Sequence, residues 1–225
     1  MNVFRLTGDM SHLLAVILLL VKIHNTRSCS GLSLRSQILF ALVFTFRYLD
    51  LFLEFYSIYN TTMKIIYLIA SYTTLYFMVV KFKSSYEKET HWCRMEYLAI
   101  PSLILTAFVT REYALLEMAW TFSIILESMA IMPQLVLLSS SGTAEVITAH
   151  YLFLLGAYRT LYIANWVYRY HMEGFFDPTS CVFGVIQSVL YADFFYLYFT
   201  RIVRNRKFQL PFHEGAQAGQ VKNII

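Results

Sequence analysis

The sequence predicts an all-α membrane protein, because it is very apolar, poor in charge and divided into long apolar stretches. Of its 225 residues, 58% are hydrophobic and only 14% are charged, and the mean hydropathy is +0.54. Soluble domains carry about 25% charged residues, so a soluble fold of this size would leave much apolar surface uncovered. Lipid is therefore expected to cover much of the molecule.

Seven apolar stretches approach the roughly 20 residues that a membrane-spanning helix needs. They are Phe4–Val21, Ser36–Leu53, Met63–Val80, Met95–Val109, Leu115–Leu138, Val146–Tyr168 and Phe176–Thr200. The fourth is the shortest. The first is expected to be retained rather than cleaved as a signal peptide, because it contains Arg5, Asp9 and His12 and no small-residue cleavage site follows it. We predict a seven-helix domain over residues 1–203 and a polar cytosolic tail over residues 204–225.

Loop charges indicate the orientation, since cytosolic loops carry an excess of Lys and Arg. With seven helices, twelve of the 18 Lys and Arg residues fall on the side of the C-terminus, four fall on the other side and two lie within helices. The larger group is Lys22, Arg27, Arg35, Lys81, Lys83, Lys88, Arg94, Arg201, Arg204, Arg206, Lys207 and Lys222. The smaller group is Arg5, Lys64, Arg111 and Arg169. The sequence therefore predicts a cytosolic C-terminus and an N-terminus outside the cell or in a lumen.

The stretches also suggest an internal repeat of three helices, one linking helix and three more helices. In the second helix of each triplet an arginine, Arg47 or Arg159, follows an apolar run by about seven residues. A glutamine, Gln37 or Gln134, precedes each of these arginines. An odd linking helix between triplets predicts parallel repeats about an axis along the membrane normal, a plan known in small transporters.

Ionisable residues at bilayer depth are costly and usually face a cavity. Nine are expected there: Arg5, His12, Arg47, Asp50, Glu117, Glu127, Arg159, Arg169 and Asp193. Any one alone is more often half of a structural ion pair, but this number favours a binding site. At a rise of about 1.5 Å per residue, Arg159 lies ~15 Å below Arg169. We call Arg169, Arg5, Arg47 and Arg159 the arginine ladder. Guanidinium groups bind carboxylates and phosphates, so the ladder predicts a ligand with more than one acidic group.

Other residues predict a basic group on the same ligand. Arg47 and Asp50 are three residues apart, which predicts that they share a helical face. Glu117 and Trp120 have the same spacing, and a carboxylate beside an indole ring suits an ammonium group. For a single aromatic residue, core packing is the commoner role.

His12 is a different signal, because histidine titrates near pH 6.5. A lone intramembrane histidine is more often a hydrogen-bonded core residue, whereas beside an anion site it can make binding depend on pH. Glu127 is expected to need protonation or a hydrogen-bond partner, for which Tyr158 is a candidate.

The sequence closely resembles the KDEL receptor family, the Golgi receptors that retrieve escaped endoplasmic-reticulum proteins. The resemblance covers about residues 1–208. It is carried by residues 2–6, 36–44, 47–52, 120–124, 133–135, 150–153 and 193–198, which include the motifs Arg47-Tyr48-Leu49-Asp50 and Asp193-Phe194-Phe195-Tyr196. It implies a bundle of two three-helix repeats plus a linking helix, similar to the PQ-loop and sugar-transporter folds.

The resemblance also implies the ligand, which is the C-terminal Lys/His-Asp-Glu-Leu tetrapeptide of soluble cargo. The implied ligand-binding residues are Arg5, Arg47, Tyr48, Asp50, Glu117, Trp120, Arg159, Tyr162, Asn165, Trp166 and Arg169. Among them, Arg47 with Tyr48 would hold the terminal carboxylate. Arg5 and Arg169 would bind the acidic side chains. His12, Glu127 and Tyr158 resemble the family's proton switch, with tighter binding at acidic pH and release at neutral pH. Asp193 resembles a residue required for trafficking.

The cytosolic tail departs from the family pattern. The family usually carries lysines where this chain has Arg201, Arg204 and Arg206, with Lys207 following. These residues would engage the COPI coat, and the resemblance implies COPII coat as a second partner. A phosphorylatable serine is often found where Gln209 stands.

The resemblance implies a multi-pass protein of Golgi, endoplasmic reticulum and transport vesicles, with a lumenal N-terminus and no nucleic-acid partner. No cofactor or metal site is expected. Cys29, Cys93 and Cys181 have no paired spacing and carry no information on metal or disulfide chemistry, so they are expected to be reduced. The main alternative is a PQ-loop-type transporter of amino acids. Neutral sugars would not need the arginine ladder. An enzyme is not expected, because the sequence has no HExxH motif, no paired catalytic aspartates and no serine nucleophile motif.

Overall fold

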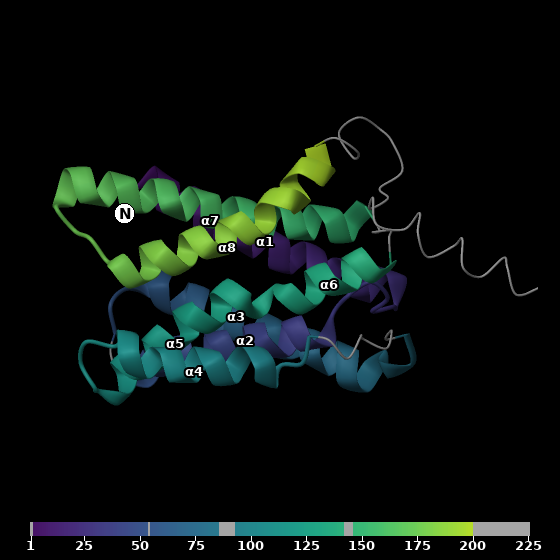
Figure 1. Ribbon diagram of the computed structural model, residues 1–225. Helices are drawn as coiled ribbons and strands as arrows, with labels where there is room; N and C mark the ends of the chain where they lie inside the picture. The colour runs from purple at the N-terminus through teal and green to yellow at the C-terminus, as the bar shows by residue number, and fades with distance from the viewer. Residues whose placement is uncertain (1, 54, 86–92, 142–145, 200–225) are drawn as a thin grey trace, which may run out of the picture.

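The computed structural model describes residues 2–53, 55–85, 93–141 and 146–199, which form helices and connecting loops without a strand (Figure 1). This confirms the all-α prediction. The α-helices are α1 (Val3–Thr26), α2 (Leu34–Arg47), α3 (Ile58–Tyr76), α4 (Glu96–Val109), α5 (Leu115–Ala130), α6 (Met132–Ser141), α7 (Val146–Glu173) and α8 (Pro178–Leu197). Shorter segments are the 3-10 helices η1 (Leu49–Phe52) and η3 (Lys83–Ser85) and the π-helix η2 (Phe77–Lys81). Every predicted apolar stretch contains a helix, and α5 and α6 share the fifth.

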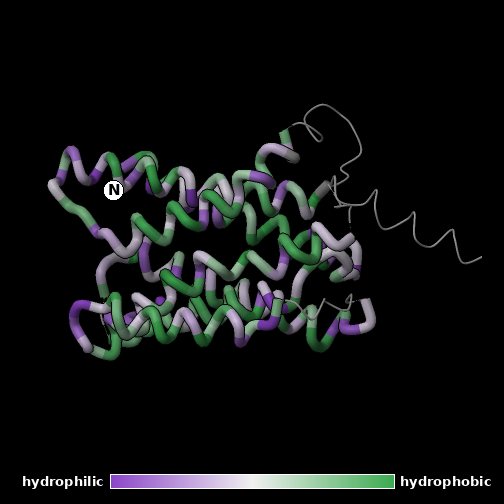
Figure 2. Tube along the Cα trace, in the orientation of Figure 1, coloured by the Kyte–Doolittle hydropathy of each residue, from purple (hydrophilic) through white to green (hydrophobic). Residues whose placement is uncertain are grey.

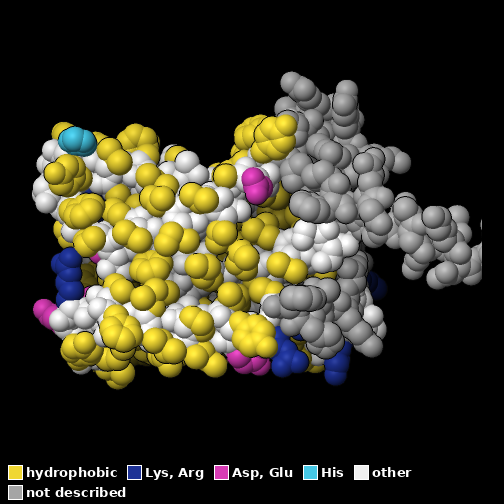
Figure 3. Space-filling view, in the orientation of Figure 1, with side chains coloured by type: hydrophobic (Ala, Val, Ile, Leu, Met, Phe, Trp, Pro, Cys, Tyr) yellow, Lys and Arg dark blue, Asp and Glu magenta, His cyan; other side chains and the backbone are white. Residues whose placement is uncertain are grey.

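The outer surface of the bundle is apolar. Hydrophobic residues run along most helices, and hydrophilic residues gather toward the helix ends and connections (Figure 2). In Figure 3, hydrophobic side chains cover the middle of the visible face, whereas Lys and Arg lie at its two ends. Within the described residues, three helical segments are long and apolar enough to cross a bilayer, namely Val3–Thr26, Ile58–Lys81 and Leu115–Ser141. Glu96–Val109 is a shorter apolar helix. The chain is therefore a multi-pass membrane protein.

The most extensive packing joins α1 to α7 and α2 to α5, and α6 also lies against α2. α3 packs against both α1 and α2, and α8 packs against both α5 and α7. α4 lies on α5. The buried core lies between these helices and includes Leu39, Leu126 and Leu152.

The second apolar stretch does not form one continuous α-helix. α2 ends at Arg47, and the chain tightens into η1 immediately after Tyr48. Arg47 and Asp50 therefore do not share a helical face, and the prediction from their spacing was wrong. Arg47 instead occupies the last turn of α2, where a cation complements the helix dipole. The tight turn allows Asp50 to pair with Lys64 on α3.

The fifth stretch is broken at Ile131, and Pro133 lies in the first turn of α6, where its missing N–H costs no helical hydrogen bond. The next residue, Gln134, is fully buried. Its side-chain oxygen accepts a 2.8 Å hydrogen bond from the Ser33 N–H, and its amide donates to the Gly31 carbonyl at 2.9 Å. Its backbone N–H donates to Ser36 Oγ at 2.9 Å. Gln134 thus joins α6 to the loop between α1 and α2.

Replacing Gln134 with Leu should destabilise the protein, because two backbone groups of that loop would lose their partner. Each such loss costs about 1–3 kcal/mol when the group is buried. Thermal unfolding in detergent should therefore show a Tm several degrees below the parent. Ser139→Ala is the matched control on α6, since Ser139 is exposed and bonds only the Val136 carbonyl of its own helix. Equal Tm values for both variants would contradict the bridging role.

Candidate functional site

A continuous cavity enters the bundle at the end where α1 begins. Its outer part, the rim cavity, has a volume of about 850 Å³ and is lined by residues such as Glu117, Arg169 and Asp177. Its inner part, the inner cavity, has a volume of about 330 Å³ and reaches His12, Glu127 and Arg159. Both parts share the lining residues Arg5, Arg47, Asp50, Asn60, Trp120, Trp166 and Ser180. The cavity therefore contains both cationic and anionic side chains along its depth.

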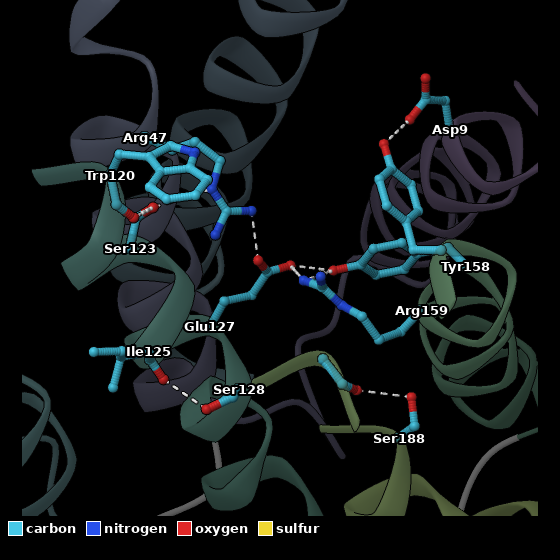
Figure 4. Close-up of polar contacts among 12 residues, drawn as sticks. Asp9, Arg47, Trp120, Ser123, Ile125, Glu127, Ser128, Tyr158, Arg159 and Ser188 are labelled. Atoms are coloured by element: carbon cyan, nitrogen blue, oxygen red, sulfur yellow. Dashed lines mark hydrogen bonds and ion pairs between the residues drawn. The ribbon is translucent and has the colours of Figure 1, made fainter. Parts of the chain in front are cut away.

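Glu127 on α5 forms the centre of the inner end (Figure 4). Its Oε2 pairs with Arg47 Nη1 of α2 at 2.5 Å, and its Oε1 pairs with Arg159 Nη2 of α7. The Tyr158 hydroxyl donates a hydrogen bond to Glu127 Oε1 and accepts one from Arg159 Nη2 at 2.8 Å. Arg47 Nε also donates to Ser123 Oγ at 3.1 Å.

The arginine ladder is thus not a row of free cations. Arg47 and Arg159 share the Glu127 carboxylate. These three side chains, which we call the Glu127 group, carry a net charge of about one positive unit. Arg47 Nη2 is buried and has no hydrogen-bond partner within the described part of the chain. Because an unpaired buried donor is costly, this atom is suited to an incoming anion. At the rim, Arg169 Nε pairs with Glu173 at 2.7 Å and its guanidinium lies 4.0 Å from the centroid of the Phe175 ring.

His12 lies in an aromatic stack on α1. Its ring centroid is 4.2 Å from that of Tyr158 and 4.6 Å from that of Tyr67, and both ring pairs are stacked. Phe44 lies at 5.7 Å. His12 is buried and lines the inner cavity beside Glu127. A charge change on this imidazole would therefore be felt by the Glu127 group.

Asp9 was not predicted as a site residue, yet three tyrosines hold it. Tyr162 and Tyr59 donate their hydroxyls to its carboxylate at 2.5 and 2.9 Å, and Tyr67 donates to its backbone carbonyl at 3.0 Å. Asp9 lies four residues after Arg5 on the same face of α1, which is the sequence signal that could have revealed it. Tyr162 also packs against Gly8, where an added Cβ would lie 2.9 Å from its ring.

Lys64 lies elsewhere than the sequence predicted. It was counted among the loop charges of the N-terminal side, but it lies on α3, is buried and lines the inner cavity. Its Nζ is 2.6 Å from Asp50 Oδ2. The predicted apolar stretch begins at Met63, so Lys64 lies at its edge.

The remaining predicted residues differ in their relation to the cavity. Glu117 and Trp120 line the rim cavity, and Trp166 fits against Gly184 of α8, where any Cβ would overlap its indole ring. Asn165 is buried and accepts a 2.7 Å hydrogen bond from Asn2, which also caps the start of α1.

Of the remaining predicted residues, Tyr48 lines the cavity and Asp193 does not. Tyr48 stacks on Phe44 with 5.8 Å between ring centroids and lines only the inner cavity. Asp193 is exposed on α8 and lines neither cavity. The predicted coat-binding residues Arg201, Arg204, Arg206 and Lys207 lie outside the described residues.

Comparison with known proteins decides the family. Residues 28–169 match the family described as ER lumen protein retaining receptor. The chain is 60% identical over 212 residues to the ER lumen protein-retaining receptor erd-2.2 of Caenorhabditis elegans, covering 94% of this chain and all of the relative. It is 55% identical over 211 residues to the ER lumen protein-retaining receptor 2 of Homo sapiens, with the same coverage. The chain belongs to the ER lumen protein-retaining receptor family. This confirms the predicted resemblance.

In this receptor the Glu127 group should be the main stabilising contact of the inner cavity. Glu127→Gln leaves two buried guanidinium groups without a carboxylate, a change that typically costs about 3–5 kcal/mol. Tyr158→Phe removes two hydrogen bonds from the same group, one to Glu127 and one from Arg159, and should cost about 1–3 kcal/mol. Unfolding in detergent should therefore rank the Tm values as parent, Tyr158→Phe and Glu127→Gln in descending order. A Glu127→Gln protein as stable as Tyr158→Phe would refute this ranking.

Proposed function

We propose that this receptor binds the C-terminal Lys/His-Asp-Glu-Leu signal of soluble endoplasmic-reticulum proteins and returns them from the Golgi. The observation that carries the proposal is the mixed charge of a single cavity. Arg5, Arg47 and Arg169 supply cations, while Glu117 beside Trp120 supplies an acidic and aromatic site. The signal likewise carries three carboxylates and one basic side chain, so its charges complement those of the cavity.

In the proposed complex the terminal carboxylate binds Arg47, whose unpaired Nη2 supports this assignment, with Tyr48 nearby. The two acidic side chains bind Arg5 and Arg169. The basic side chain binds among Asp50, Glu117 and Trp120, all of which line the rim cavity. Arg159, Tyr162, Asn165 and Trp166 complete and position the walls.

The proposal includes seven membrane spans arranged as two three-helix repeats. Support comes from the packing, because the third helix of each triplet, α3 or α8, lies against the other two. The cross-contacts of α1 with α7 and of α2 with α5 are those that a two-fold relation would produce. Together with the loop charges, this plan puts the cavity mouth and the N-terminus in the lumen and the C-terminus in the cytosol.

Retrieval also requires cytosolic sorting. We assign this to Arg201, Arg204, Arg206 and Lys207 as contacts of COPI, with COPII acting on the outward journey. Asp193 is exposed on α8, at a site accessible to other proteins in the membrane. The receptor would accordingly cycle through Golgi, endoplasmic reticulum and transport vesicles.

Direct binding of a Lys-Asp-Glu-Leu peptide to the purified receptor tests the proposal. The matched control is the same peptide with a C-terminal amide, which removes the group assigned to Arg47. Isothermal titration at pH 5.5 should show saturable binding of the acid and at least tenfold weaker binding of the amide. Equal affinity for both peptides would contradict the assigned pose, and no binding of the acid would refute the function.

The proposal includes pH-dependent binding through His12. The ligand has one positive and three negative groups, so it brings two net negative charges beside the imidazole. Its binding therefore favours protonated His12, and by linkage protonation favours binding. Affinity should rise as pH falls from neutral to acidic, and His12→Ala should make the affinity ratio between the two conditions approach one. The ratio is measured by titration at pH 5.5 and 7.4, and a ratio unchanged from the parent would exclude His12 as the switch.

A further inference from the structure

The further inference concerns Lys64, which the proposed binding site leaves without a role. Lys64 Nζ pairs with Asp50 Oδ2 at 2.6 Å, so the carboxylate assigned to the ligand's basic residue is already occupied by a cation of the protein. The lysine is 8% exposed and lines the inner cavity. The pair therefore lies inside the ligand cavity and not on the outer surface.

The surroundings of this pair leave room for a second partner on each side. Asp50 Oδ1 is buried and has no hydrogen-bond partner among the described residues. Lys64 Nζ lies 5.9 Å from the Tyr48 ring centroid and 5.6 Å from that of Tyr56, and aromatic faces stabilise an ammonium without neutralising its charge. The long flexible stem of a lysine allows its head group to move while the stem stays packed.

We propose that Lys64 is a ligand-binding residue that exchanges partners when the signal enters, an inference that rests on the proposed function. The basic side chain of the ligand takes Asp50, and Lys64 turns to one of the ligand's two side-chain carboxylates. The single ion pair within the protein is replaced by two ion pairs with the ligand, so neither Asp50 nor Lys64 is left as an unpaired buried charge.

Because of the exchange, recognition requires both the basic side chain of the ligand and the side-chain carboxylate that Lys64 binds. A peptide without the basic residue does not release Lys64 from Asp50. A peptide without the matching carboxylate leaves the released Lys64 unpaired. Selectivity then comes from the penalty on incomplete ligands, because unpaired buried charges oppose binding. Lys64 would thus be a specificity-determining residue, in addition to the arginines of the ladder.

The test measures the coupling between Lys64 and each ligand charge. The parent receptor, Lys64→Met and Lys64→Arg are titrated at pH 5.5 with Lys-Asp-Glu-Leu and with three variants, Ala-Asp-Glu-Leu, Lys-Asn-Glu-Leu and Lys-Asp-Gln-Leu. Lys64→Met should weaken binding of the unmodified peptide at least tenfold, and Lys64→Arg should recover part of that loss. For Ala-Asp-Glu-Leu, the loss of affinity caused by Lys64→Met should shrink to under threefold. The same should hold for either Lys-Asn-Glu-Leu or Lys-Asp-Gln-Leu, and the peptide that shows it identifies the ligand carboxylate that Lys64 binds.

Two results would overturn the exchange. A similar loss for all four peptides would show that Lys64 only supports the cavity wall. Unchanged or tighter binding of Lys-Asp-Glu-Leu by Lys64→Met would show that Lys64 only competes for Asp50. The parent receptor separates this proposal from the broader one, because its binding of the unmodified peptide tests the function without reference to Lys64. The Tm of each variant in detergent confirms that the compared proteins are folded.

Discussion

The inner half of the bundle depends on the Glu127 carboxylate and its two guanidinium partners. Arg47 belongs to α2, Glu127 to α5 and Arg159 to α7, so one buried carboxylate fixes three helices relative to one another. An ion pair in low dielectric is favourable only when its remaining donors and acceptors are satisfied. Tyr158 and Ser123 supply part of this requirement. The group remains one cation in excess, which makes the end of the cavity electropositive.

In the proposed function, the same positive excess accounts both for the binding of an anionic ligand and for its dependence on pH. An anion that reaches Arg47 completes the charge balance that the protein leaves open. His12 lies in contact with Tyr158, one residue from Arg159, so protonation there adds positive charge to the same small volume. A protonated imidazole and an entering anion therefore stabilise each other. In the proposed complex, binding and proton uptake would be linked by proximity, without a separate conformational signal.

The sequence predicted the fold class, and most of the charged residues that line the cavity, better than the pairings among those residues. Long apolar stretches located the helices, and costly intramembrane charges located the cavity, because both depend on local sequence. The prediction that Arg47 and Asp50 share a helical face was wrong, because α2 ends at Arg47 and the chain continues as a tighter 3-10 helix. Lys64 and Asp9 were missed because their partners lie on other elements. Lys64 pairs with Asp50, and Asp9 is bound by two tyrosines of α3 and one of α7. Contacts between helices distant in sequence are not visible in spacing.

The distribution of strong contacts also favours a receptor over a transporter. Alternating access would require a path past His12, which is stacked between two tyrosines, and past the Glu127 group, which ties α2, α5 and α7 together. Beyond that group, Gln134 holds α6 to the loop between α1 and α2 with two hydrogen bonds and to Ser36 of α2 with a third. Opening this end would break several buried polar contacts at once. At the other end, the rim cavity already provides a volume of about 850 Å³. The energetic asymmetry supports entry and exit of a ligand from one side only, as a receptor needs.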